Sequence, residues 1–155
     1  GLMLAASYYD GNYLLDENLV VEDNAERNRL TFGGKYENGK LTVRSEYIYG
    51  ETGMGNRKAG EYYLLESDGF YVAAGYWFNY TCKKTGLQHK IRPVARYDFF
   101  REDITEINTN STYYMVGVDW WPMQNLRLLV NYTLKDKVAN DNFGHLFQAQ
   151  LSVKF

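Results

Sequence analysis

Residues 112–135 read TYYMVGVDWWPMQNLRLLVNYTLK, and they contain two alternating segments joined by a short connector, residues 122–125. One face of the first segment carries Tyr114, Val116, Val118 and Trp120. One face of the second carries Leu126, Leu128, Val130, Tyr132 and Leu134, and its other face carries Arg127, Leu129, Asn131, Thr133 and Lys135. Side chains that alternate at a period of two indicate strands with two different faces. This stretch therefore predicts an antiparallel strand pair.

The same alternation recurs along the rest of the chain. The six further segments are residues 2–9, 29–36, 41–49, 70–80, 90–100 and 145–155. No stretch shows a sustained helical period, and the 155 residues include 15 Tyr but only 2 Pro, a composition that favours strands. We therefore predict an all-β chain of about eight antiparallel strands, forming one domain over residues 1–155.

The connectors between these segments alternate in length. Those at one end are short or intermediate: residues 37–40, 81–88 and 122–125. Those at the other end are longer: residues 10–28, 50–69, 101–111 and 136–144. Short turns at one end and long loops at the other are typical of transmembrane β-barrels of the bacterial outer membrane, in which the short turns are periplasmic.

Charge and aromatic residues indicate that one face meets lipid. The apolar faces of the predicted strands carry no Lys, Arg, Asp or Glu, whereas a lipid-facing Lys or Arg at mid-depth costs about 2–4 kcal/mol. Tyr, Trp and Phe gather toward both ends of these faces, as interfacial belts do. A soluble β-sandwich or lipocalin-like barrel is the alternative, with the same faces packed as a core.

The opposite faces are rich in basic residues. Candidates for lining a pore are Arg29, Lys35, Arg44, Arg92, Arg96 and Arg127, and Lys90, Lys135 and Lys154 share their phase. Only Glu46, Asp98 and Asp119 oppose them. A basic lining raises the local concentration of anions. The alternative for any single arginine is a structural ion pair, Arg44 with Glu46 or a neighbour and Arg92 or Arg96 with Asp98.

Several classes of function are disfavoured. The net charge of −2 argues against nucleic acid as a partner, and the single Cys82 allows neither an internal disulfide nor a cysteine metal cluster. We expect no metal and no cofactor. His89 and His145 fall at opposite ends of the predicted strands and no nucleophile motif accompanies them, so an enzyme is not expected.

Residues 117–132 combine a Gly-x-Asp-Trp strand end, a short turn, and then Asn-x-Arg and Asn-Tyr on the next strand. This pattern, with residues 69–76 and 95–98, resembles the phosphate-selective porin O and P family. Phe155 at the end of an alternating strand resembles the signal by which the barrel-assembly machinery recognises its clients. The resemblance implies a 16-stranded, homotrimeric channel for passive diffusion of small anionic, phosphate-like solutes across the outer membrane.

On this hypothesis residues 1–155 are the C-terminal eight strands of a porin whose earlier strands precede Gly1. Eight strands closed on themselves leave room only for side chains, whereas 16 leave an aqueous channel. The alternative is therefore a complete eight-stranded outer-membrane barrel with a structural or adhesive role. An outer-membrane enzyme is a third possibility.

Overall fold

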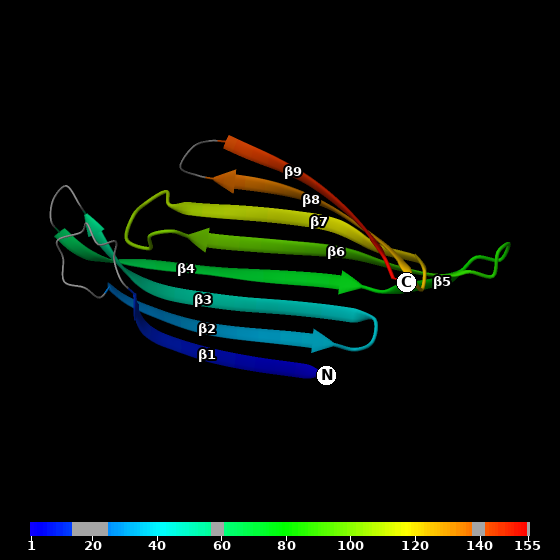
Figure 1. Ribbon diagram of the computed structural model, residues 1–155, viewed down its shortest axis with the longest axis horizontal. Coiled ribbons are helices and arrows are strands. Elements are labelled where there is room, and N and C mark those ends of the chain that lie inside the picture. The colour runs from blue at the N-terminus through cyan, green and yellow to red at the C-terminus, as the bar shows by residue number, and fades with distance from the viewer. Residues whose placement is uncertain (14–24, 57–60, 138–141, 155) are drawn as a thin grey trace.

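The computed structural model describes residues 1–13, 25–56, 61–137 and 142–154, and these form one nine-stranded antiparallel sheet (Figure 1). The strands are β1 (Leu2–Tyr13), β2 (Ala25–Glu37), β3 (Leu41–Asn56), β4 (Glu61–Tyr76), β5 (Phe78–Thr81), β6 (Gln88–Arg101), β7 (Asn110–Met123), β8 (Leu126–Lys137) and β9 (Asn142–Val153). Phe155 lies outside the described residues. No helix in the described part of the chain is long and apolar enough to span a bilayer.

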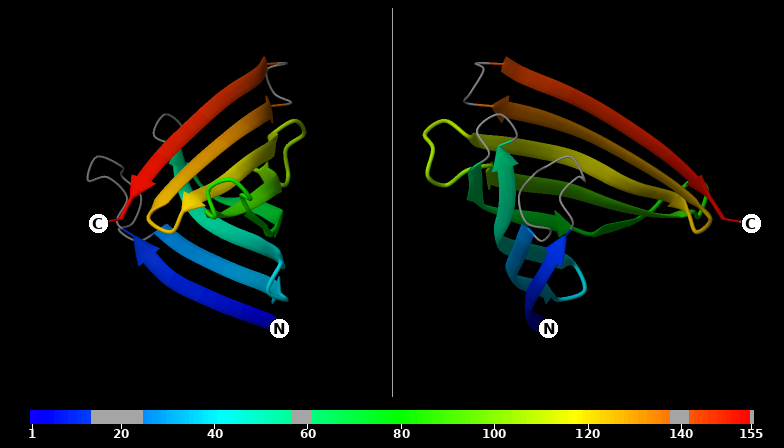
Figure 2. Two further views of the ribbon diagram at one scale, coloured as in Figure 1. Left: turned by 90° about the vertical axis from the view of Figure 1, so that its right-hand side faces the viewer. Right: turned by 60° about the vertical axis from the view of Figure 1, so that its left-hand side comes forward.

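The strands follow one another in chain order, so that each spanning strand pairs with its neighbours in sequence. The order is β1-β2-β3-β4-β6-β7-β8-β9, and β5 pairs with β6 beyond the end of β4. β1 and β9 are the two edges of an open, twisted trough (Figure 2). This all-β, antiparallel architecture confirms the predicted fold class.

Two details of the predicted strands are wrong. Residues 70–80 were expected to form one strand, but the strand is interrupted at Trp77, whose backbone N–H donates to the Lys40 carbonyl (2.8 Å). The predicted connector 50–69 is largely strand, because β3 and β4 stay in register up to the pair Asn56 and Glu61. Hydrophobic alternation identifies only the part of a strand whose one face is apolar. Backbone hydrogen bonding between the two strands continues beyond that part.

The turns explain why the chain reverses where it does. At residues 38–40 the side chain of Asn38 accepts a hydrogen bond from the Leu41 amide (2.9 Å), and Gly39 has φ of 81°. Gly adopts this left-handed conformation without the steric cost that a Cβ imposes. Both ends of the chain lie at this short-turn end of the sheet (Figure 1), as an even number of spanning strands requires.

The register sorts the side chains onto two faces. The convex face carries the predicted apolar residues, and they are open to the surroundings: Val116 is 57% exposed and Val118 is 43% exposed. Its aromatic side chains pack across neighbouring strands, for example Phe70 against Tyr97 (5.7 Å between ring centroids) and Tyr97 against Tyr114 (5.3 Å). Within the described residues, no other element packs against this face.

At the long-loop end the convex face becomes polar. Arg101 donates two hydrogen bonds to Asp68 (2.7 and 2.8 Å), and the Tyr47 hydroxyl contacts the same carboxylate (3.3 Å). Tyr49 donates to Glu51 (2.9 Å) and is within 3.0 Å of a Glu66 oxygen. These charges lie just past the aromatic residues, where the strands continue into the predicted loops. The uncharged band is therefore limited to the middle of the face.

Candidate functional site: the concave basic face

The register places all six predicted pore-lining residues on the concave face. Arg29 and Lys35 come from β2, Arg44 from β3, Arg92 and Arg96 from β6, and Arg127 from β8. Lys35 is the register partner of Arg44, and Ala73 links Arg44 to Arg96 across β4. We call this surface, with its neighbouring polar residues, the basic face.

Asp119 is the charge centre of the short-turn half of this face. Asp119 is a buried residue, and its carboxylate accepts hydrogen bonds from Arg92 (2.8 Å), from Arg127 (2.7 and 3.0 Å) and from the indole N–H of Trp121 (3.1 Å). One negative charge thus serves two arginines on β6 and β8, and the group keeps a net positive charge. The ion-pair alternative gave Asp98 to Arg92 or Arg96, and the partner of Arg92 is Asp119.

Two further residues predicted to line the pore each pair with a single carboxylate. Arg96 is bound in a fork by Asp98 on the same strand (2.5–2.9 Å), as the ion-pair alternative anticipated. Lys35 pairs with Glu37, a concave-face acid that the sequence interpretation had assigned to a turn. These pairs are partly exposed, so they orient the side chains more than they stabilise the fold.

Arg29 and Arg44 are different. Both are exposed on the concave face, and among the described residues neither makes an ion pair. The expected pairing of Arg44 with Glu46 or a neighbour is therefore not found in the described part of the chain. Arg27, on the same face of β2, also lacks an ion pair there; it fell in a predicted loop and was missed.

Aromatic rings cover one side of several of these cations. The guanidinium of Arg96 lies 4.1 Å from the ring centroid of Tyr71, and that of Arg92 lies 4.6 Å from the Trp77 ring. Arg127 stacks on Trp121 (5.6 Å), and the Lys135 ammonium lies 4.9 Å from the Tyr113 ring. Cation–π contacts of this kind hold long side chains flat against the wall. Tyr71 and Tyr113 alternate in phase with the predicted basic residues. Their position on the concave face could therefore have been predicted from the alternation along each strand.

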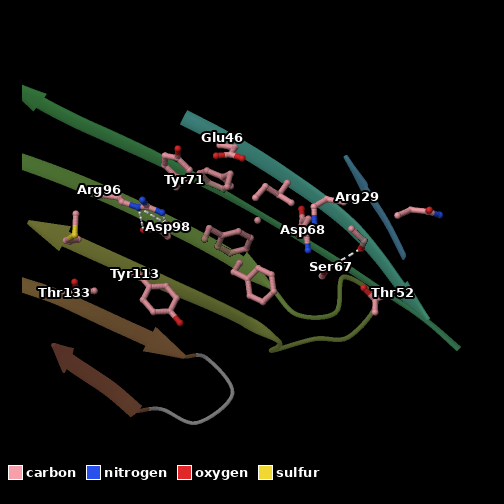
Figure 3. A pocket seen from close by; sticks show the side chains of 18 of the residues that line it. Arg29, Glu46, Thr52, Ser67, Asp68, Tyr71, Arg96, Asp98, Tyr113 and Thr133 are labelled. Carbon is pink, nitrogen blue, oxygen red and sulfur yellow. Dashed lines mark hydrogen bonds and ion pairs between the residues drawn. The ribbon is translucent and has the colours of Figure 1, made fainter. Parts of the chain in front are cut away.

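The concave face encloses a hollow of about 800 Å³ near the long-loop end (Figure 3). Small residues on β3 and β4, Gly50, Ser67 and Gly69, form its floor. Larger side chains surround them, and these include Arg27, Arg29, Glu46, Ile48, Thr52, Tyr71, Arg96, Asp98, Phe100, Tyr113, Met115 and Thr133. The hollow thus combines cations with apolar and aromatic side chains.

The groups that could perform chemistry are dispersed. The described residues contain no cluster of three or more metal-ligating side chains. His89 stacks between Tyr80 and Trp120 at the short-turn end, and His145 contacts the Tyr132 hydroxyl on the long-loop half of β9. Cys82 has a free thiol in the turn before β6, and hydrogen bonds from Thr85 lower its pKa.

A comparison with protein families gives a match to phosphate-selective porin O and P over residues 6–155. No curated protein matched the chain. No solved structure matched it either. The family match covers nearly the whole sheet, from within β1 through β9.

Proposed function

Because the chain belongs to the phosphate-selective porin O and P family, we propose that its basic face lines a water-filled channel that small anions enter more readily than cations. The family is one of non-enzymatic porins, which places the chain in the bacterial outer membrane with solutes passing through the barrel. The convex face then contacts lipid, which accounts for its exposed and uncharged middle band.

The observation that carries the anion preference is the positive charge left after pairing. Asp98 and Glu37 each neutralise one cation, but Asp119 is shared by Arg92 and Arg127. Among the described residues Arg29 and Arg44 make no ion pair, and neither does Glu46 on the same face. In a channel bounded by a low-dielectric wall, uncompensated cations concentrate anions. The guanidinium fork also suits the oxygens of phosphate or a carboxylate.

The width of the channel depends on how the sheet closes. β1 and β9 are not neighbours, so each leaves one edge without a partner in the described structure. Hydrocarbon requires every backbone group to have an internal partner. We propose that further strands pair with both edges, giving the 16-stranded barrel that the family resemblance implies. The alternative is a small eight-stranded barrel closed between β1 and β9, which would be impermeable to ions.

The experiment is a reversal-potential measurement across a KCl gradient, using the assembled protein from outer membranes in planar bilayers. We expect chloride preference in the unmodified protein. A double variant, Arg29→Gln with Arg44→Gln, should lower that preference by roughly threefold, because about kT of pore potential is removed. The matched control, Lys83→Gln with Lys84→Gln, changes charge equally in a turn outside the sheet. Cation selectivity of the unmodified protein, or no conductance at all, would contradict the proposal.

Two partners are proposed from the family resemblance. The first is the barrel-assembly machinery, with Phe155 as the recognition signal at the end of the last strand. The second is the protein itself, as a homotrimer. Deletion of Phe155 should lower the amount of assembled barrel in the outer membrane, and cross-linking in intact membranes should give trimers.

A further inference from the structure

We propose that the hollow at the long-loop end of the basic face is a capture site for organic anions with a flat, apolar body, of which aromatic carboxylates are the simplest class. The inference rests on the proposed anion channel, and it adds which anions the channel selects. Its basis is an apolar surface beside Arg27 and Arg29, which make no ion pair among the described residues. The hollow lies at the end where a solute would enter from outside (Figure 3).

The apolar half of the site is formed by two large apolar side chains, Ile48 and Phe100, which face the lumen where polar side chains would also be compatible with water. Phe100 is 45% exposed and Ile48 is 38% exposed, and both point to the concave face. They flank Gly69 in the register, and the Phe100 ring lies 3.1 Å from the position that a Cβ on Gly69 would occupy. The absence of a side chain at Gly69 therefore lets the ring lie close to the sheet and present its surface.

The cationic half lies beside it. Arg29 is the register partner of Gly50, and Arg27 is the register partner of Thr52, so both reach the hollow over small residues of β3. The Ser67 hydroxyl adds a polar group, although it donates to the Gly50 carbonyl (3.4 Å). A carboxylate held by Arg29 would leave the body of its molecule directed toward Ile48 and Phe100.

Glu46 is the carboxylate of the hollow that has no ion pair among the described residues. It lies four residues before Gly50 on β3, a separation of about 13 Å at the rise of a strand. The other concave-face acid of the hollow, Asp98, is occupied by Arg96, and Asp68 is bound by Arg101. The Arg27 and Arg29 end of the hollow is therefore the one that attracts an anion.

This arrangement discriminates by shape as well as by charge. An inorganic anion contacts only the arginines, whereas an aromatic carboxylate also removes apolar surface of Ile48 and Phe100 from water. Benzoate and acetate carry the same charge, so their difference isolates the contribution of the apolar half. Partial burial of a ring strengthens binding by about tenfold.

The test measures block of the chloride current through the assembled protein by added benzoate and by added acetate. We expect benzoate to reach half-block at about one tenth of the acetate concentration. Equal half-blocking concentrations would overturn the inference. The KCl reversal potential of the same channels reports the anion preference separately, so failure of the proposed channel function is distinguished from failure of the capture site.

Variants assign the effect to this site. Phe100→Ser should remove most of the benzoate advantage. Ile48→Ser should act in the same direction if the first variant does not assemble. The matched control is Leu129→Ser, an apolar concave-face residue of β8 outside the hollow. Arg29→Gln should weaken block by both anions. An undiminished benzoate advantage in both serine variants would refute the site.

Discussion

Asp119 illustrates how a single buried charge organises the wall of the channel. It lies on β7 between Arg92 on β6 and Arg127 on β8, and it accepts hydrogen bonds from both. Its side chain is 2% exposed, whereas the two arginines are about one quarter and one third exposed, 27% and 33%. The carboxylate therefore fixes the arginines against the wall while their outer edges remain accessible.

Replacing Asp119 with Asn should weaken the assembled barrel and increase its preference for anions. The substitution leaves two adjacent guanidiniums without a counter-charge, and loss of one partner from a largely buried ion pair costs about 3–5 kcal/mol. The measurements are the urea midpoint for loss of the assembled form and the KCl reversal potential. Glu46→Gln is the control, since this concave-face acid has no ion pair among the described residues. Equal stability of the two variants would contradict the role given to Asp119.

At the scale of elements, the connector from Glu102 to Thr109 is a structured loop. The carboxylate of Asp103 accepts hydrogen bonds from the Thr105 amide (2.8 Å) and hydroxyl (2.6 Å), and the Thr109 hydroxyl donates to the Asp103 carbonyl (2.6 Å). The Ile104 amide donates to the Glu66 carbonyl (2.9 Å), which joins the loop to β4. Glu66 precedes Ser67, a residue that lines the hollow, so this hydrogen bond anchors the loop close to the long-loop end of the concave face.

The loop should loosen in acid. The hydrogen bonds from Thr105 lower the pKa of Asp103, so its contribution is complete above the ordinary aspartate pKa of about 3.9 and is lost as the pH falls through the lowered value. Protection of the Thr105 amide from hydrogen exchange, corrected for the intrinsic pH dependence, should decrease over that interval. Asp103→Asn keeps an acceptor but cannot titrate, so its protection should not change with pH. A similar decrease in this variant would exclude Asp103 as the cause.

The whole molecule is a sheet with two different environments. Its convex side presents an uncharged band bordered by aromatic residues and, at the long-loop end, by the Arg101–Asp68 ion pair. Its concave side gathers the cations and the hollow. A sheet with these two faces is stable only where lipid contacts the convex side and water contacts the concave side.

Lysine substitutions on opposite faces test this division directly. Val116→Lys places a charge in the middle of the convex band and should destabilise the barrel in bilayers by about 2–4 kcal/mol. Thr133→Lys places the same charge on the concave face, one strand away, and should assemble normally. The measurement is the free energy of unfolding in lipid vesicles. Equal destabilisation by both variants would show that the convex band does not face hydrocarbon.

The strand class, the antiparallel order and the assignment of side chains to faces could be predicted from the sequence. Period-two alternation is a local property of the sequence. The lack of charged residues on one face indicates that this face contacts an apolar environment, and this inference needs no tertiary information. The strand ends could not be predicted in this way: β3 and β4 extend through residues 50–56 and 61–69 because backbone pairing needs no apolar face. The break at Trp77 likewise depends on where β3 begins, because the Trp77 amide binds the carbonyl of Lys40, the residue before β3.

By itself, the sequence determined that one face of each strand is apolar and that the opposite faces together carry an excess of basic residues, because alternation and charge are properties of the residue order. Only the tertiary structure decided which cations are neutralised, because ion pairs depend on the register between strands. It assigned Arg92 and Arg127 to Asp119 and left Arg29 and Arg44 without an ion pair in the described residues. The hollow also required the fold, since Gly50, Gly69 and Phe100 become neighbours only when β3, β4 and β6 pair.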